Sequence, residues 1–244
     1  MSGDSSAVQD PAGALQKIKS RGYWLISIKP VGYTSARFKT IQRCREVAEK
    51  TTVVLRGWDY PHSPRDGPTI KQDHVEGWVD WDAHKELWRL YRSGQFVHFL
   101  GLREDWYEEA DWFGPVHPEV KPGTILEPIH AVLTLTEVFE YFARLARLEE
   151  RIFAEGAEAR VVLRRASGRT LHVLDPRRAP MFGEYRCAAE AVQFTQTLNE
   201  KQLSGENRKL AISAAVEIMM RFQWQNPPVA VFEDVQQRLY EKRL

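Results

Sequence analysis

The fold class depends most on residues 159–174, which read ARVVLRRASGRTLHVL. Two alternating runs, 159–165 and 170–174, flank the turn-forming sequence Ala-Ser-Gly-Arg, and this pattern is typical of a β-hairpin. A further alternating run over 191–198 predicts another strand. Because a hairpin, a strand and helices follow one another in this half of the chain, the sequence predicts an α+β fold with a mixed sheet, packed helices and C-terminal helices.

Before the hairpin, the sequence predicts four more strands. Period-two alternation of apolar and polar residues marks three of them, and β-branched residues mark the fourth. These strands are expected over residues 23–29, 51–58, 74–81 and 95–102. In the first of them, Trp24, Ile26 and Ile28 share one face, which predicts that this face is buried.

Helices are predicted where apolar residues recur at i, i+3, i+4 and i+7. A short helix ends near Gly22, Ser35 is the expected N-cap of a second helix, and Asp82 is that of a third, which Gly94 ends. The buried stripe of this third helix is expected to be His84, Leu87, Trp88 and Tyr91.

Glu127 and Pro128 fit the N-cap and the first position of a long helix that continues to about residue 155. A strand over 131–136 followed by a shorter helix is the alternative, because that stretch is rich in β-branched residues. Two further helices are expected over 207–222 and 229–243. The predicted core residues lie on the apolar faces of these elements and are Trp24, Ile26, Trp88, Phe96, Phe139, Phe142, Leu210 and Phe222.

Composition indicates one globular body. Of the 244 residues, 43% are hydrophobic and 27% are charged, which is ordinary for a folded domain. Residues 1–13 hold little that can be buried and are expected to form a flexible leader. Residues 14–244 are expected to form a single α+β body with a soft seam near residue 156.

Charge and cysteine content exclude several classes of protein. The net charge is +1, from 34 Lys and Arg against 33 Asp and Glu, so no global field attracts nucleic acid or an anionic membrane. Cys44 and Cys187 are too few for a disulfide scaffold and lack paired spacing for zinc. No apolar run approaches the length of a membrane span, and the polar start is unlike a signal peptide. We therefore expect a cytoplasmic protein that does not contact membranes.

Five short strings spread over the chain resemble a known set of sequences. They are RGYW at 21–24, VLRGWDYPH at 54–62, WRLYRSGQF at 88–96, DPRR at 175–178 and FQWQNPP at 222–228. The strings resemble bacterial proteins of uncharacterised function, which occur alone or attached to Schlafen-like, AlbA-type ATP-binding domains. The resemblance implies a bacterial, intracellular setting linked to nucleic-acid or defence biology. It assigns no activity, ligand or site residue, and the ATP-binding part is lacking here.

The strongest local charge signal lies between residues 160 and 186, where the sequence has seven arginines and only two acidic residues. If the predicted hairpin forms, Arg160 and Arg164 share one face and can straddle phosphates. The candidate binding residues of this segment are Arg160, Arg164, Arg165, Arg169, Arg177 and Arg178. A solvated strand face, or a dock for the acidic residues 104–111 in a segment expected to be a surface loop, is the competing interpretation.

A second candidate binding site lies where the strand predicted over 51–58 runs into a proline-rich loop. Its residues are Arg56, Trp58, Asp59 and His62. Such strand ends often carry ligand sites, and a guanidinium can hold a phosphate or carboxylate through two hydrogen bonds. The alternative is an Arg56–Asp59 pair with Trp58 packed as a plug.

Other chemistry-bearing residues carry weaker signals. Asp80, Asp82 and His84 offer donors that a divalent metal accepts, although Asp82 also fits an N-cap. His98 alternates with Phe96 and is interpreted as a buried core histidine, with a general base as the alternative. No phosphate loop, nucleophile elbow, HExxH or CxxC motif occurs, so no catalytic residue, metal or cofactor is assigned.

These observations leave three hypotheses open. The first is a non-enzymatic binding or assembly subunit of a bacterial intracellular complex, with a protein partner or with self-association. The second is a nucleic-acid-binding protein that uses the arginine-rich hairpin. The third is a metal-dependent hydrolase built around Asp80, Asp82 and His84.

Overall fold

The computed structural model describes residues 10–110, 120–149 and 152–243. Among them, seven strands form one sheet in which every pairing is antiparallel. These strands are β1 (Tyr23–Pro30), β4 (Thr69–Ile70), β5 (His74–Trp81), β6 (His84–Tyr91), β7 (Phe96–Gly101), β9 (Ala157–Arg164) and β11 (Ala191–Leu198). Their order is β11-β9-β1-β7-β6-β5-β4, so β1 lies between β7 and β9.

Two smaller sheets each contain two strands. In one, β2 (Val53–Val54) pairs antiparallel with β3 (Asp59–Tyr60). In the other, β8 (Ile125–Leu126) pairs parallel with β10 (Thr170–Leu171). The first sheet fixes both ends of the segment 55–58, and the second holds the chain just before the longest helix.

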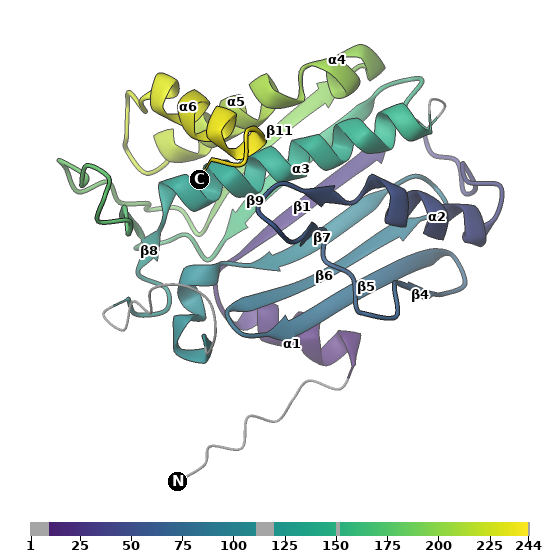
Figure 1. Ribbon diagram of the computed structural model, residues 1–244, viewed down its shortest axis with the longest axis horizontal. Coiled ribbons are helices and arrows are strands. Elements are labelled where there is room, and N and C mark those ends of the chain that lie inside the picture. The colour runs from purple at the N-terminus through teal and green to yellow at the C-terminus, as the bar shows by residue number, and fades with distance from the viewer. Residues whose placement is uncertain (1–9, 111–119, 150–151, 244) are drawn as a thin grey trace, which may run out of the picture.

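Helices cover both faces of the large sheet (Figure 1). On one face, α3 and α5 pack side by side, with α5 against β11, and α6 contacts both helices; α1 contacts β5, β6 and β7 on the other face. The helices are α1 (Pro11–Ser20), α2 (Ile41–Thr51), α3 (Pro128–Leu148), α4 (Glu200–Gly205), α5 (Asn207–Met220) and α6 (Val229–Tyr240), with short 3₁₀-helices η1 (Arg103–Asp105) and η2 (Tyr107–Glu109). An antiparallel sheet with packed helices confirms the α+β class.

The main core lies between the sheet and α3. All eight predicted core residues are buried, and they belong to one hydrophobic cluster. Glu127 caps α3, as predicted, because its side chain accepts a hydrogen bond from the backbone N–H of His130. The alternative strand over residues 131–136 is wrong, since these residues are helical and buried.

The helix predicted from Asp82 to Gly94 is wrong, because residues 84–91 form strand β6. Asp82 and Gly94 lie in the turns at its two ends, with φ of 51° and 84°. Trp88 and Leu90 face the side of α2 and α3, where the main core lies, while Lys85 and Leu87, which are also buried, face the side of α1. Burial on both faces removes the alternation that identifies a half-buried strand.

The hairpin predicted over 159–174 is also wrong. Strand β9 pairs with β1 on one side and β11 on the other, so neither of its edges is left for the residues that follow. Residues 170–171 pair with β8 instead, and Thr170 forms a bridge with Arg186. The two alternating runs on either side of the Gly turn therefore pair with strands distant in sequence and not with each other.

Smaller differences concern termini and loops. Thr40, not Ser35, caps α2, and the strand expected over 51–58 is limited to Val53–Val54. The acidic segment expected to be a surface loop is buried from residue 104 to residue 107, because its charges find partners inside the protein. Its residues 111–113 lie outside the described part of the chain.

The flexible leader expected over residues 1–13 and the single body expected over 14–244 remain predictions. Asp10 caps α1, so residues 11–13 are helical, while residues 1–9 are not described. Strands β9 and β11 follow residue 156 and still join the sheet that contains β1. Within the described ranges, we find no helix with the length and apolar character that crossing a membrane requires.

Candidate functional site

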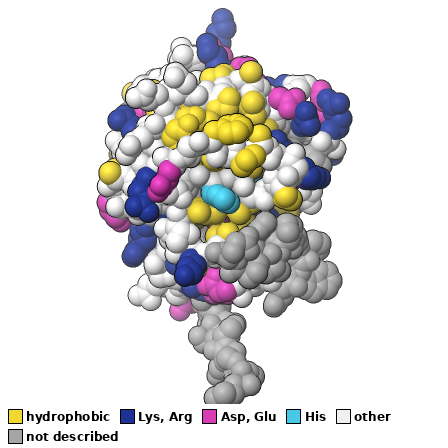
Figure 2. All heavy atoms as spheres, turned by 90° about the vertical axis from the view of Figure 1, so that its left-hand side faces the viewer, with side chains coloured by type: hydrophobic (Ala, Val, Ile, Leu, Met, Phe, Trp, Pro, Cys, Tyr) yellow, Lys and Arg dark blue, Asp and Glu magenta, His cyan; other side chains and the backbone are white. Residues whose placement is uncertain are grey.

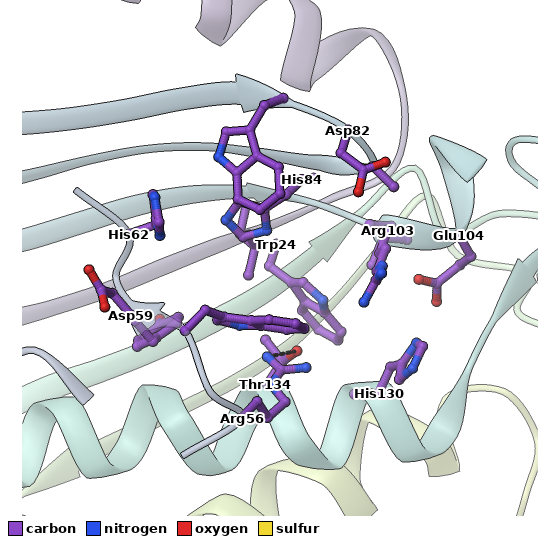
Figure 3. Close-up of a pocket in the computed structure, with 18 of the residues that line it drawn as sticks. Trp24, Arg56, Asp59, His62, Asp82, His84, Arg103, Glu104, His130 and Thr134 are labelled. Carbon is purple, nitrogen blue, oxygen red and sulfur yellow. Dashed lines mark hydrogen bonds between the residues drawn. The ribbon is translucent and has the colours of Figure 1, made fainter. Parts of the chain in front are cut away.

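A cavity of about 460 Å³ lies at one end of the large sheet. Its wall comes from β1, from the segment 56–62, from the turn between β5 and β6, from the end of β7 with η1, and from the first turns of α3 (Figure 3). On the face that lies to the left in Figure 1, hydrophobic side chains gather around a histidine (Figure 2). Clefts of this size, roughly 300 to 1,000 Å³, hold small molecules in other proteins.

Aromatic side chains dominate the wall. Trp24 is buried, Trp58 is half-buried, and Trp81 is 43% exposed. His62 lies 5.8 Å from Trp81 and 6.0 Å from His84 between ring centroids. Ring faces at this density offer a flat ligand stacking surfaces that do not depend on a particular substituent.

Arg56 is held by the first turns of α3. Its guanidinium donates to the buried Glu137 carboxylate and, at 3.4 Å, to Thr134 Oγ1. It also lies 5.3 Å from the centre of the Trp58 ring, a cation–π contact. The alternative Arg56–Asp59 pair is therefore not formed, and the charge of Arg56 is balanced from inside the protein.

Behind this wall, four polar side chains form a chain of contacts that we call the Glu86 relay. The Tyr60 hydroxyl lies 3.1 Å from His98 Nδ1, and His98 Nε2 lies 3.2 Å from Glu86 Oε2. The same oxygen is 3.3 Å from His84 Nε2, off the ideal direction of a hydrogen bond. Tyr60, Glu86 and His98 are buried. Two members of the relay, Tyr60 and His84, also line the cavity.

The Glu86 carboxyl is charged despite its burial. Burial raises the pKa of Glu86, but electrostatic interaction with the neighbouring His98 and His84 imidazoles lowers it further, so the pKa falls to about 2. The other carboxylate oxygen accepts the backbone N–H of His62. Trp88 Nε1 donates to the His62 carbonyl at 2.7 Å, so β6 fixes this part of the wall.

A second pair of buried carboxyls lies near the N-terminus of α3. Glu104, which lines the cavity, accepts a hydrogen bond from the backbone N–H of Glu127 at 2.9 Å. Burial raises the pKa of Glu127 to about 8, and the nearby charge of Glu104 raises it further. Burial also raises the pKa of Glu104, and the charge of Asp105 adds to that effect. Figure 3 shows Glu104 close to Arg103 and His130.

All four residues of the predicted strand-end site lie together. Arg56, Trp58, Asp59 and His62 line the cavity, at the places where β2 and β3 hold the segment between them. The sequence did not indicate the opposite wall. Thr134 lines it from α3, and Glu86 lies behind it in β6. Only the His84-x-Glu86 spacing is a local signal, because it places both side chains on one face of a strand.

The predicted arginine site is not gathered in one place. Arg160 and Arg164 lie on the outward face of β9, and Arg160 donates to Gln193 at 3.0 Å. Arg165 donates to the Lys19 carbonyl at 2.8 Å. Two further members, Arg177 and Arg178, pair with Asp175 in an exposed loop.

Arg169 has a different environment from the other five. Its side chain is 1% exposed and forms two hydrogen bonds with Asp105. Contact with the acidic residues 104–111 is an alternative role that the sequence suggests for the arginine segment. Arg169 makes such a contact, inside the protein. Arg169 is therefore closed to any external phosphate in this conformation.

The residues of the metal hypothesis are also divided. Asp80 pairs with Lys17 at 3.0 Å and with Lys85 at 3.1 Å, on the face of the sheet opposite to the core. Asp82 and His84 line the cavity. In the described part of the chain, no three His, Cys, Asp or Glu side chains form a group suited to a metal ion.

Comparisons with protein families, with curated proteins and with solved structures found no significant match to this chain. The geometry of the cavity is therefore the basis for a functional proposal.

Proposed function

We propose that this chain is a non-enzymatic binding module whose ligand is a small molecule with a planar aromatic ring. The carrying observation is the cavity of about 460 Å³, whose wall includes Trp24, Trp58 and Trp81. Aromatic rings in contact gain roughly 0.5 to 1.5 kcal/mol beyond the burial of their area. Three indoles around one cavity therefore favour a flat ligand over an aliphatic one of equal size.

Polar groups in the same wall support a ligand that also carries hydrogen-bonding atoms. His62, His84 and Asp59 lie among the apolar side chains, as do the carboxyl of Glu104 and the hydroxyl of Thr134. A few polar groups on an apolar wall are what fixes the orientation of a ligand in known binding sites. The proposal includes a bacterial cytoplasmic setting, which the sequence resemblance and the two unpaired cysteines support.

Calorimetric titration with ring compounds of different shape tests this proposal. Indole, adenine and uracil are the probes, and cyclohexanol is the aliphatic comparison. We expect at least one ring compound to bind saturably and cyclohexanol not to bind. Trp58→Ala should weaken ring binding by about tenfold, since stacking on one aromatic side chain contributes about 1 to 3 kcal/mol.

Trp224→Ala is the matched control. Trp224 stacks on Tyr185 at 5.3 Å between centroids and does not line the cavity. Its replacement should leave ring binding unchanged. Absence of saturable binding by all three ring probes, or equal losses in the two variants, would contradict the proposal.

Assembly through a protein contact is the second candidate function, and one observation favours it. Phe182 is 94% exposed, in the same loop as the exposed Arg177. Exposed aromatic and arginine side chains are enriched at protein interfaces. Sedimentation velocity should show concentration-dependent self-association that Phe182→Ser abolishes, while ring binding in the cavity is retained. A monomer at every concentration would exclude self-association through this loop.

A further inference from the structure

We infer that the cavity selects nitrogen heterocycles that present an N–H donor at the ring edge, and that His84 Nδ1 accepts this hydrogen bond. The inference deepens the proposed function and rests on it. It adds the chemical class of the ligand and the residue that recognises it. The argument depends on which nitrogen of His84 carries the proton.

Glu86 determines that position. Its carboxylate is an acceptor only, and Oε2 faces both His84 Nε2, at 3.3 Å, and His98 Nε2, at 3.2 Å. A nitrogen lone pair that faced this oxygen would be repelled, so each imidazole places an N–H there. The low pKa of Glu86 supports a charged acceptor at neutral pH.

His98 and His84 differ at their second nitrogen. His98 Nδ1 meets the Tyr60 hydroxyl at 3.1 Å, so both nitrogens of this buried ring have partners. The His84 side chain is 25% exposed and lines the cavity, and within the described residues its Nδ1 has no hydrogen-bond partner. His98 therefore supports Glu86, while His84 presents an acceptor to a ligand.

Neighbouring rings define what can reach this acceptor. Trp81 and His62 flank His84, with ring centroids at 5.5 Å and 6.0 Å. A ligand that donates to His84 from between these rings must therefore be flat. Its donor lies at the edge of a ring whose faces contact the aromatic side chains of the wall. Purine and pyrimidine bases, indoles and related heterocycles have this combination of a flat body and an edge N–H.

The position of the proton can be reversed by one substitution. In Glu86→Gln the amide orientation is fixed, because one atom must still accept the backbone N–H of His62, as Glu86 Oε1 does. The carbonyl takes that place, and the NH₂ group then faces His84 Nε2 and His98 Nε2. Both imidazoles must accept there, which moves their protons to Nδ1. His84 would then donate into the cavity instead of accepting.

Indole and benzoxazole test the inference by calorimetry, because they share a bicyclic shape while one has a ring N–H and the other only acceptors. Wild-type protein should bind indole about tenfold more tightly than benzoxazole, since an acceptor left unpaired on binding is costly. Glu86→Gln should lose or reverse this preference. His84→Phe should bind both compounds equally, and Trp224→Ala, which lies outside the cavity, should retain the wild-type preference.

Imidazole ¹⁵N shifts give a readout that requires no ligand. We expect His84 to carry its proton on Nε2 in wild-type protein and on Nδ1 in Glu86→Gln. Equal affinities of the wild type for indole and benzoxazole, or a His84 proton on Nδ1, would overturn the inference. If neither compound binds, adenine and uracil do not bind either, and the His84 proton is on Nε2, the proposed function itself is overturned, and the ligand class with it.

Discussion

Two buried ionic clusters in this protein differ in how completely they are closed. Around Asp105, both oxygens accept from Arg169 and from backbone N–H groups of Gly22 and Gly123, at 2.7 and 2.8 Å for the two backbone contacts. Arg169 also donates to the carbonyls of Ile125 and Arg165. In the Glu86 relay, by contrast, the chain of contacts ends on His84 at the cavity wall.

This difference separates scaffold from site. A buried charge is tolerated when every polar atom has a partner, and a closed cluster then fixes the elements that contribute to it. The Asp105 cluster joins the start of β1, η1 and β10 in this way. A cluster with an open end has the same cost of burial but leaves one group for an external molecule, which is why we assign ligand recognition to the Glu86 relay.

The largest expected effect is on the closed cluster. Asp105→Ala leaves the Arg169 guanidinium buried without its counter-charge, and loss of one partner of a buried pair costs about 3 to 5 kcal/mol. Urea unfolding should show this loss. Asp234→Ala, which removes an exposed pair with Arg238, is the control and should change the free energy of unfolding by less than about 0.5 kcal/mol. Similar small losses in both variants would contradict the assignment of Asp105 as scaffold.

Glu127 predicts a loss of stability as pH rises. Burial raises the pKa of Glu127 from 4.5 to about 8, so between these values the folded chain holds a proton that the unfolded chain has released. Over that window, this group should lower the free energy of unfolding by about 1.4 kcal/mol per pH unit. Urea titrations at stepped pH should show that Glu127→Gln lacks this contribution. An identical pH dependence in the variant would contradict it.

Glu86 predicts the opposite sign at lower pH. Its pKa is about 2 in the folded protein against the ordinary 4.5, so it stabilises the fold above pH 4.5. This contribution is lost as pH falls from 4.5 towards 2, again by about 1.4 kcal/mol per unit. The acid limb of the same titrations should be shallower in Glu86→Gln. A steeper limb would mean that the relay is not a charged carboxylate.

Features that depend on residues close together in the sequence could be predicted from it, and features that depend on residues far apart in the sequence could not. The apolar faces of β1, β11 and α3, and the cap at Glu127, depend on neighbours within a few residues, and they were predicted correctly. Strand β6 was predicted as a helix because Lys85 and Leu87 are buried on one face and Trp88 and Leu90 on the other. That burial comes from α1 on one face and from α2 and the main core on the other, which local periodicity does not contain.

The candidate site shows the same limit. The segment from Arg56 to His62 was found because a strand end, a glycine and polar residues are adjacent in sequence. Glu86 was missed because its partners, the His62 backbone N–H and the His98 ring, are 24 and 12 residues away and meet it only after the sheet has formed. The pair between Arg169 and Asp105 spans 64 residues, so the buried arginine was grouped with exposed ones.

The smallest expected effect is on the outward face of β9. Arg160→Ala and Arg164→Ala remove side chains that are half-exposed, so the free energy of unfolding should change by less than about 0.5 kcal/mol in each. Chromatography on immobilised single-stranded DNA checks the remaining nucleic-acid hypothesis. Retention that falls steeply with salt and is lost in the double variant would favour it, because released counterions cause such dependence.

The central place of β1 in the sheet has a consequence for biosynthesis. Tyr23–Pro30 leaves the ribosome before both of its neighbours in the sheet, Phe96–Gly101 and Ala157–Arg164. At about 5 to 20 residues per second, several seconds pass before the second neighbour is made. During that time β1 exposes an unpaired edge and an apolar face, Trp24, Ile26 and Ile28, to other nascent chains. The nascent protein therefore depends on protection of this segment, and slower translation before β9 should increase aggregation.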